Sequence, residues 1–314
     1  MKILLLMACF TAGLAVETCR AAGESLLQAG DIIALVGGEE MVSAAELGEM
    51  EIALVTAAPE LHLTIRSLAW EGDTVFEQHR DLNYPKLEEQ LAQIGATVAM
   101  VQFGQMECLG GAPKLPEFVA AYDRLLTRMA GDNKRRLVLF PPHHFTAMPN
   151  GSTPDLTTHN DDADSYAAAI RTLAEKHGST VAEWTFSSAS AVTELTRDGI
   201  HLNRWGEVLR AQGLAGMLLP AARISLAPMK KSGAAEALLR LINEKNRLWF
   251  NYYRPQNWAF LGGDRTSQPS SRDYRDPSKR WFPEEMEQYL PLIAEKERAI
   301  WKRAEKLRTS GGEP

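Results

Sequence analysis

The chain has 314 residues, of which 45% are hydrophobic and 24% charged, and its formal net charge is −6 at pH 7. This composition supports one sizeable core and predicts one domain of about 200 residues with an extension. Because the chain is acidic and its basic residues are spread along it, we expect no nucleic-acid partner.

Residues 1–21 have the pattern of a signal peptide. Lys2 provides a small positive charge, residues 3–16 are apolar, and residues 19–21 form an acceptable cleavage site. Alternatives are a buried first helix or strand, or a lipid anchor at Cys9. We expect an exported protein, periplasmic or extracellular, in which Cys108 is the one remaining cysteine and a small buried residue. No later stretch is apolar enough to predict a membrane span.

Apolar runs alternate with helical patterns between residues 29 and 222. The expected strands are residues 32–36, 63–68, 98–103, 137–140 and 180–183. The expected helices are residues 43–57, 85–94, 115–129, 163–177 and a helix from about 204 that Asn203 caps. Ser43 and Glu46 form a possible capping box for the first helix. The alternation predicts an α/β protein, a three-layer α/β/α sandwich with a five-stranded parallel sheet.

Ligands bind to such sheets at the carboxyl ends of the strands. Here glycine and polar residues follow three of the expected strands: residues 37–40 the first, Gly72 the second and residues 104–107 the third. The sequence therefore predicts a site at this edge of the sheet, without indicating its chemistry.

From about residue 232 the pattern becomes helical and aromatic. Residues 234–251 form an amphipathic pattern, and residues 283–307 a charged helix. Between them lies an aromatic cluster: Trp249, Phe250, Tyr252, Tyr253, Trp258 and Phe260. We expect residues 232–308 to be a helical extension that this cluster holds against the α/β domain. The alternative is that the aromatic side chains line a sugar-binding groove.

Asp198 and His201 stand three residues apart and are separated by Gly199 and Ile200. This spacing suits a tight turn in which the carboxylate orients the imidazole as a general base. Together with the cap at Asn203, this stretch resembles the C-terminal block of the SGNH, or GDSL, ester hydrolases.

The resemblance covers about residues 30–222, with the family's four blocks in order, and implies an SGNH (flavodoxin-like) domain over residues 29–222. In this family a Ser after the first strand is the nucleophile, and a Gly and an Asn after the next two strands are oxyanion donors. Those positions correspond here to Glu39, Gly72 and Met106. Residues 247–253 also resemble, more loosely, the tail of GDSL-like proteins from planctomycete-type bacteria.

Two of these positions lack the family's chemistry. Glu39 cannot form the ester intermediate that Ser forms, and its charge opposes a developing oxyanion. The thioether of Met106 donates no hydrogen bond, and the loss of one oxyanion donor costs about 3–4 kcal/mol. One alternative is a relocated nucleophile at Ser43 or Thr74.

The same edge carries several carboxylates. Glu39, Glu40, Asp73 and Glu107, with Asp198 and His201, could hold a divalent cation or act as a general acid and base on water. For Glu39 and Glu107 taken singly, the simplest interpretation is a solvated loop carboxylate. The spacings match no known metal motif, so we assign neither a metal nor a cofactor. We also expect at most one of His143 and His144 to reach the site.

By resemblance, the expected function is an SGNH/GDSL-type ester hydrolase that removes acyl groups, such as acetyl, from carbohydrate or a similar small substrate. The alternative is a catalytically inactive protein of this fold that binds a glycan or a protein partner. The residues at positions 39 and 106 favour the alternative as a mechanism.

Overall fold

The structure, a computed structural model, describes residues 25–132, 135–148, 153–183, 195–220 and 233–310. The expected signal peptide, with Cys9 and Cys19, lies outside the described residues, as does the expected boundary between domain and extension at residues 222–232. Within the described ranges, no helix is long and apolar enough to cross a membrane.

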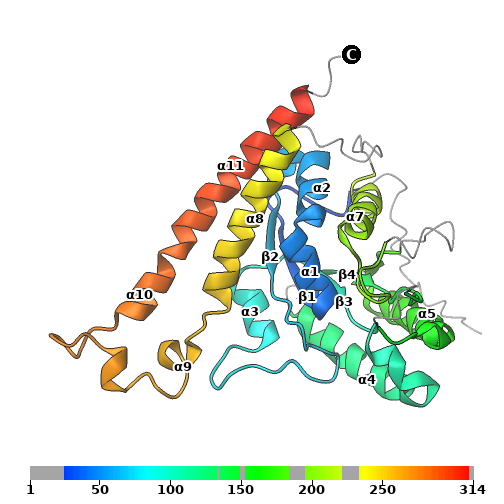
Figure 1. The fold of residues 1–314 in the computed structure, drawn as a ribbon, viewed down its shortest axis with the longest axis horizontal. Helices are drawn as coiled ribbons and strands as arrows, with labels where there is room; N and C mark the ends of the chain where they lie inside the picture. Colours follow the sequence, from blue (N-terminus) through cyan, green and yellow to red (C-terminus); the bar gives the residue numbers. More distant parts are fainter. Residues whose placement is uncertain (1–24, 133–134, 149–152, 184–194, 221–232, 311–314) are drawn as a thin grey trace, which may run out of the picture.

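A five-stranded parallel sheet lies at the centre of the fold (Figure 1). Its strands are β1 (Ile32–Gly37), β2 (Thr64–Ser67), β3 (Val98–Gln102), β4 (Arg136–Phe140) and β5 (Thr180–Val181). Their order is β2-β1-β3-β4-β5, and all neighbouring pairs are parallel. The predicted α/β class and its five strands are confirmed, with β5 shorter than expected.

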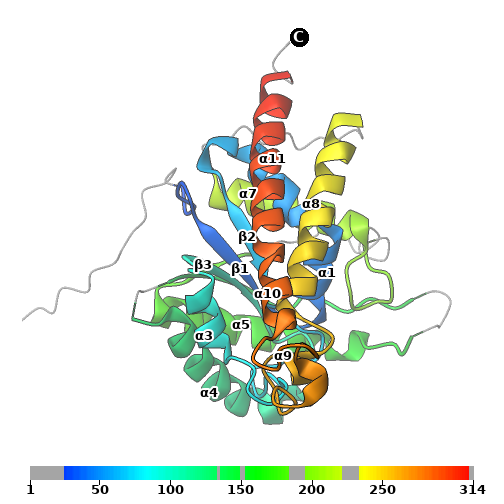
Figure 2. The same ribbon diagram turned by 90° about the vertical axis from the view of Figure 1, so that its left-hand side faces the viewer.

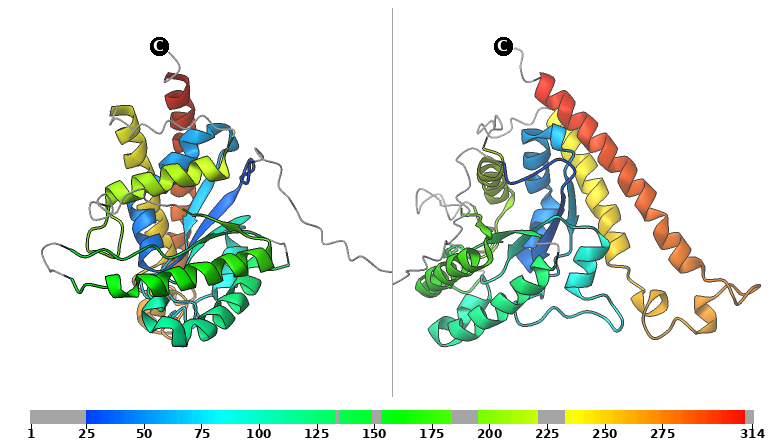
Figure 3. Two further views of the ribbon diagram at one scale, coloured as in Figure 1. Left: turned by 90° about the vertical axis from the view of Figure 1, so that its right-hand side faces the viewer. Right: turned by 180° about the vertical axis from the view of Figure 1, so that it is seen from behind.

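Both faces of the sheet are covered, which explains why the strands read as continuous apolar runs. Along β1, Ile33 and Leu35 point into one core, while Ala34 and Val36 point into the other. The first core lies under α1 (Glu39–Leu47), α2 (Glu49–Ala57) and α7 (Arg204–Leu218). The second lies under α3 (Leu87–Gln93), α4 (Gly111–Ala130) and α5 (Asn160–His177), on the other side of the sheet (Figure 3).

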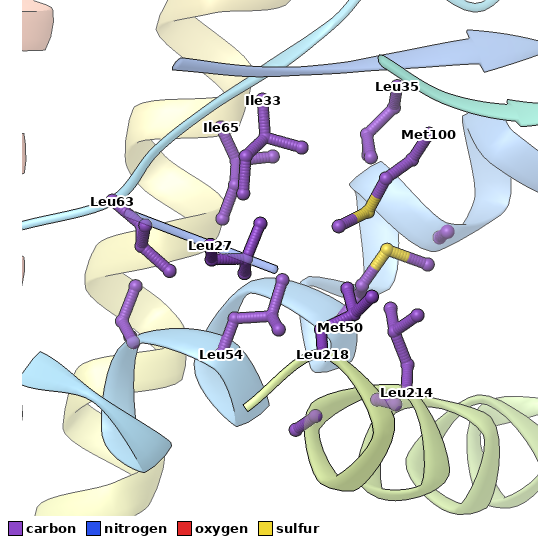
Figure 4. Packing of buried hydrophobic residues seen from close by; sticks show 14 of the residues in the cluster. Leu27, Ile33, Leu35, Met50, Leu54, Leu63, Ile65, Met100, Leu214 and Leu218 are labelled. Carbon is purple, nitrogen blue, oxygen red and sulfur yellow. The ribbon is translucent and has the colours of Figure 1, made fainter. Parts of the chain in front are cut away.

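The first core shows how helices and sheet meet. Leu35 of β1 and Met100 of β3 face Met50 of α2 and Leu214 of α7 (Figure 4). All four side chains are at most 3% exposed. Burial of one such side chain stabilises the fold by about 1.5–3 kcal/mol, so this face fixes the positions of the helices whose ends carry the site.

The expected capping box at Ser43 is wrong. Helix α1 begins earlier, at Glu39, and its N-cap is Gly38, which has no side chain to form a cap. Ser43 lies in the second turn of the helix, where its side chain is buried. Its hydroxyl accepts a hydrogen bond from a distant arginine, described below, so a tertiary contact replaces the local cap that the sequence pattern suggested.

A glycine divides the expected helix 43–57 into two. Gly48 has φ +71°, a left-handed conformation that ends α1 and starts α2. A Cβ atom at Gly48 would lie 2.5 Å from Oδ1 of Asn243, on helix α8 (Gly233–Tyr253). The glycine therefore permits both the break and the close approach of the C-terminal extension.

The extension contains α8, α9 (Trp258–Leu261), α10 (Trp281–Glu287) and α11 (Tyr289–Ser310). Helices α8 and α11 lie side by side and antiparallel, and both contact α2 (Figure 2). The expected helix 283–307 is thus two helices separated at Gln288. Four short 3₁₀ turns complete the described chain: η1 (Pro59–Leu61), η2 (Glu107–Gly110), η3 (Thr157–His159) and η4 (Pro269–Ser271).

The aromatic cluster attaches the extension to the domain, as the sequence predicted. Trp249 donates its indole N–H to the carbonyl of Ser67 at 2.7 Å, and its ring stacks on Tyr253 with centroids 5.7 Å apart. Trp258 donates to the carbonyl of Leu82 at 2.8 Å. The ring of Trp249 is therefore buried, that of Trp258 is partly exposed, and each indole N–H has a partner on the α/β domain.

A buried ion pair reinforces this attachment. The Lys245 ammonium on α8 is fully buried and donates to Oε2 of Glu51 on α2 at 2.9 Å and to the carbonyl of Ile65 at 3.0 Å. Burial lowers the pKa of Lys245 and raises that of Glu51, while their mutual attraction opposes both shifts. Removal of either partner would leave the other charge buried without compensation.

We expect Lys245→Met to lower the free energy of unfolding by about 3–5 kcal/mol, because Glu51 would stay buried without its cation. Urea denaturation measures this loss. The matched control is Lys296→Met, which breaks the exposed pair between Lys296 on α11 and Glu244 on α8 and should cost about 0–1 kcal/mol. Equal losses in the two variants would contradict this role for Lys245.

Candidate functional site

Asp198 and His201 form a hydrogen-bonded pair. Nδ1 of His201 lies 2.7 Å from Oδ2 of Asp198, while Oδ1 accepts the backbone N–H of Ile200 at 3.0 Å and of His201 at 2.7 Å. Burial raises the pKa of Asp198, but these hydrogen bonds outweigh it and place the pKa below its usual value. The charged carboxylate therefore holds the proton of His201 on Nδ1 and leaves Nε2 as the basic nitrogen.

The loop after β4 holds this turn in place. Gly199 has φ +84°, and a Cβ atom there would lie 2.3 Å from the carbonyl oxygen of Thr146. The N–H of Thr146 donates to the Gly199 carbonyl at 2.9 Å, and Nε2 of His143 donates to the Ile200 carbonyl at 2.6 Å. The loop after β4 thus holds the turn that carries Asp198 and His201 through hydrogen bonds to two backbone carbonyls of that turn.

A buried ionic cluster lies behind the turn. Oε1 of Glu40 accepts the N–H of Leu202 at 3.2 Å, and its Oε2 accepts from Nη1 of Arg210 at 3.0 Å. Arg210 also pairs with Glu207, and its side chain is only 2% exposed. The start of α1 is therefore tied to the residue that follows His201.

Glu39 lies beside the pair, in the first turn of α1, where the helix dipole favours a negative charge. Nη2 of Arg197 lies 2.5 Å from its Oε1, Nη1 donates to Oγ of Ser43 at 3.2 Å, and Nε lies 3.8 Å from Oδ2 of Asp198. One guanidinium thus bridges Glu39 and Asp198. The interpretation of Glu39 as a solvated loop carboxylate is wrong, because it is a helical residue with a cationic partner.

The turn that contains Gly72 is adjacent to the start of α1. The N–H of Trp70 donates to the Gly37 carbonyl at 3.1 Å, and a Cβ atom at Gly38 would lie 3.1 Å from the Asp73 carbonyl oxygen. A Cβ atom at Gly72 itself would meet nothing within 4 Å, so packing does not require glycine there. The structure therefore places Gly72 near the position that Glu39 occupies.

Met106 and Glu107 follow β3 at the same edge. Met106 is 49% exposed, and its thioether offers no hydrogen-bond donor. Glu107 accepts the backbone N–H of Val75 at 2.9 Å and of Gly104 at 2.8 Å. The solvated interpretation of Glu107 is therefore also wrong, because its carboxylate joins the loop after β2 to the loop after β3.

Neither candidate for a relocated nucleophile is placed for attack. Ser43 is 4% exposed and accepts from Arg197, while Oγ1 of Thr74 accepts the backbone N–H groups of Phe76 and Glu77 within its own turn. Among the described residues, no group of three or more His, Cys, Asp or Glu side chains could hold a metal ion. Asp73 is instead paired with Arg80.

The sequence pattern assigns no role to three residues that the structure places at this edge: Arg197, His143 and Gln105. Arg197 directly precedes Asp198, but its partner Glu39 is 158 residues away. Of the adjacent histidines His143 and His144, the sequence predicts that at most one reaches the site. His143 does so, whereas His144 is exposed and contacts Asp164. Burial lowers the pKa of His143, and Gln105 exchanges two hydrogen bonds with its backbone. His143 thus supports the turn at residues 198–201 through its hydrogen bond to the Ile200 carbonyl, and burial favours its neutral form.

The solved structures that resemble this α/β chain include proteins described as SGNH and GDSL-like hydrolases. A gut microbial diltiazem-metabolizing enzyme matches 90% of this chain and 97% of its own, with 11% identity and a TM-score of 0.63. A protein from Parabacteroides merdae described as a GDSL-like lipase matches 61% of this chain and 97% of its own, with 16% identity and a TM-score of 0.48. At 11% identity, the likeness to the diltiazem-metabolizing enzyme concerns the fold alone. No protein-family model and no curated protein matches the sequence.

Stability should depend on pH through Glu207. Burial raises its pKa from 4.5 to about 7, although Arg210 opposes the shift. Between these values the folded protein keeps a proton that the unfolded chain releases, so the free energy of unfolding should fall as the pH rises through about 5 to 8. Glu207→Gln should reduce this fall in urea titrations at several pH values, whereas the exposed control Glu295→Gln should leave it unchanged. An unchanged slope in Glu207→Gln would disprove the assignment.

Proposed function

We propose that this protein is an SGNH-type hydrolase of acyl esters, such as acetyl esters of carbohydrate, in which His201 activates water directly. The observation that carries the proposal is the hydrogen-bonded Asp198–His201 pair on a turn that stays partly open, with the His201 side chain 19% exposed. Nε2 of His201 would take a proton from water as the oxygen attacks the ester carbonyl, and would return it to the leaving alcohol oxygen as the ester C–O bond breaks. Residues 1–21 support export, so the substrate would lie outside the cytoplasm.

Arg197 supports this mechanism in two ways. Its guanidinium pairs with Glu39 and so offsets the negative charge that would oppose a developing oxyanion. Two of its nitrogens donate to Glu39 and Ser43, and an arginine has five N–H donors in total. The N–H groups that do not face Glu39, Ser43 or Asp198 remain to donate to a substrate oxygen.

Turnover by this route should be slow. Water attack without a covalent intermediate forgoes nucleophilic catalysis, and one missing oxyanion donor alone lowers the rate about a hundred- to a thousandfold. The substrate would therefore be an activated or tightly bound ester.

A second candidate is a protein that binds a glycan or protein partner without turnover. The observation that favours it is the ion pair of Glu39 with Arg197 at the nucleophile position, together with the engagement of Ser43 and Thr74 in other contacts. The two candidates differ in their dependence on His201, because only hydrolysis requires its basic nitrogen.

Hydrolysis of p-nitrophenyl acetate by the purified chain should be slow but above the buffer rate, and His201→Ala should reduce it at least about tenfold. Asp198→Asn should act in the same direction because it alters the tautomer of the imidazole. The control is His144→Ala, an exposed histidine that pairs with Asp164 and should leave the rate unchanged. If wild type and His201→Ala show equal rates, the hydrolase proposal fails and binding without turnover remains.

Glu39→Ser tests whether position 39 is the nucleophile position. If a hydroxyl at position 39 reaches Nε2 of His201, Glu39→Ser should raise the rate at least about tenfold and produce an initial burst of p-nitrophenol. The control Glu39→Ala removes the same carboxylate without adding a hydroxyl and should show no burst. A Glu39→Ser rate no higher than that of Glu39→Ala would contradict the correspondence.

A further inference from the structure

A pocket of about 270 Å³ lies between α1 and α8, apart from the His201 turn. Val42 and Ala45 of α1 form one wall, Ser67 and Ala69 at the end of β2 line it, and residues 243–254 of the extension complete it. On α1, Ser43 contacts Arg197 of the candidate site, while its neighbour Val42 lines the pocket. The pocket and the candidate site therefore lie on different sides of one helix.

Two arginines line this pocket, and they differ in their partners. Arg254 pairs with Glu71 at 2.7 Å and lies 4.1 Å from the centroid of the Trp70 ring. Arg247 is exposed, and its one described contact is with the ring of Phe250, 5.8 Å from its guanidinium carbon. Among the described residues, no carboxylate lies within 4.0 Å of Arg247. Its charge is therefore available to an anion in the pocket.

The other polar groups offer both donors and acceptors. Asn243, Asn246 and Glu46 line the same pocket. Nδ2 of Asn246 donates to the Ala45 carbonyl at 2.9 Å, which fixes the orientation of its amide. A ligand with hydroxyl groups can donate to and accept from the two amides and donate to the carboxylate of Glu46. An anion without hydroxyl groups can use only Arg247 and the apolar side chains that line the pocket.

We propose that this pocket binds a single sugar residue that carries a carboxylate, that is, a uronic acid. The apolar side chains of Val42, Ala45 and Ala69 suit the C–H face of the ring, and the amides and Glu46 suit its hydroxyl groups. Arg247 binds the carboxylate, since a guanidinium fits that group with two parallel hydrogen bonds. The volume limits the ligand to about one ring. This proposal does not depend on turnover at His201.

Titration of the full chain with methyl glucuronide, followed by calorimetry, tests the proposal. We expect saturable binding at millimolar ligand, and Arg247→Met should weaken it about ten- to a hundredfold because a charge-assisted hydrogen bond is lost. The matched control is Arg240→Met, an exposed arginine two turns earlier on α8 and outside the pocket, which should bind as wild type does. Ala45→Phe, which fills the pocket without a change of charge, should also abolish binding.

Two further ligands test separately whether the pocket recognises the carboxylate and the hydroxyl groups of the sugar. Methyl glucoside, which lacks the carboxylate, and benzoate, which lacks the hydroxyl groups, should both bind more weakly than the glucuronide. Absence of glucuronide binding, an unchanged affinity in Arg247→Met, or equal binding of benzoate would each overturn the proposal. His201→Ala should retain glucuronide affinity, so a failure of the hydrolase proposal and a failure of this one give different results.

Discussion

The guanidinium of Arg197 bridges the two carboxylates of the candidate site. Two carboxylates, Glu39 and Asp198, stand at the same edge of the sheet, and nitrogens of one guanidinium lie within 4.0 Å of both. Arg197 supplies that cation from the residue directly before Asp198. The turn that orients His201 therefore also fixes the side chain of Glu39. Whether the site hydrolyses or only binds, this contact joins the start of α1 to the turn that carries His201.

The edge of the sheet is held by polar contacts between loops rather than by apolar packing alone. Glu107 joins the loops after β2 and β3, Gln105 joins the loop after β3 to His143, and His143 supports the turn after residue 198. Each such hydrogen bond contributes about 0.5–1.5 kcal/mol, and loss of one partner leaves a buried group unsatisfied. The loops are therefore positioned before any ligand arrives, which general-base chemistry requires.

The sequence predicted those parts of the fold that depend on local pattern. The apolar runs of β1 and β3, the cap at Asn203 and the Asp198–His201 turn each have signals within a few residues. The errors at Ser43 and Glu107 share another cause. Each side chain makes its decisive contact with a residue far along the chain, 154 and 32 positions away. The pattern of a single sequence does not carry such pairings, so the charge balance at Glu39 was also unpredictable.

The extension belongs to the architecture of the site. The match to the diltiazem-metabolizing enzyme covers 90% of this chain, whereas residues 25–220 are fewer than two thirds of it, so the shared fold includes extension helices. Trp70 explains why this matters. Its indole N–H points to the hydroxyl of Tyr253 at 3.4 Å, while its backbone N–H donates to the Gly37 carbonyl. The turn at Gly72 is thus held by α8 on one side and by the start of α1 on the other. Loss of the extension would therefore release one of the loops that form the candidate site.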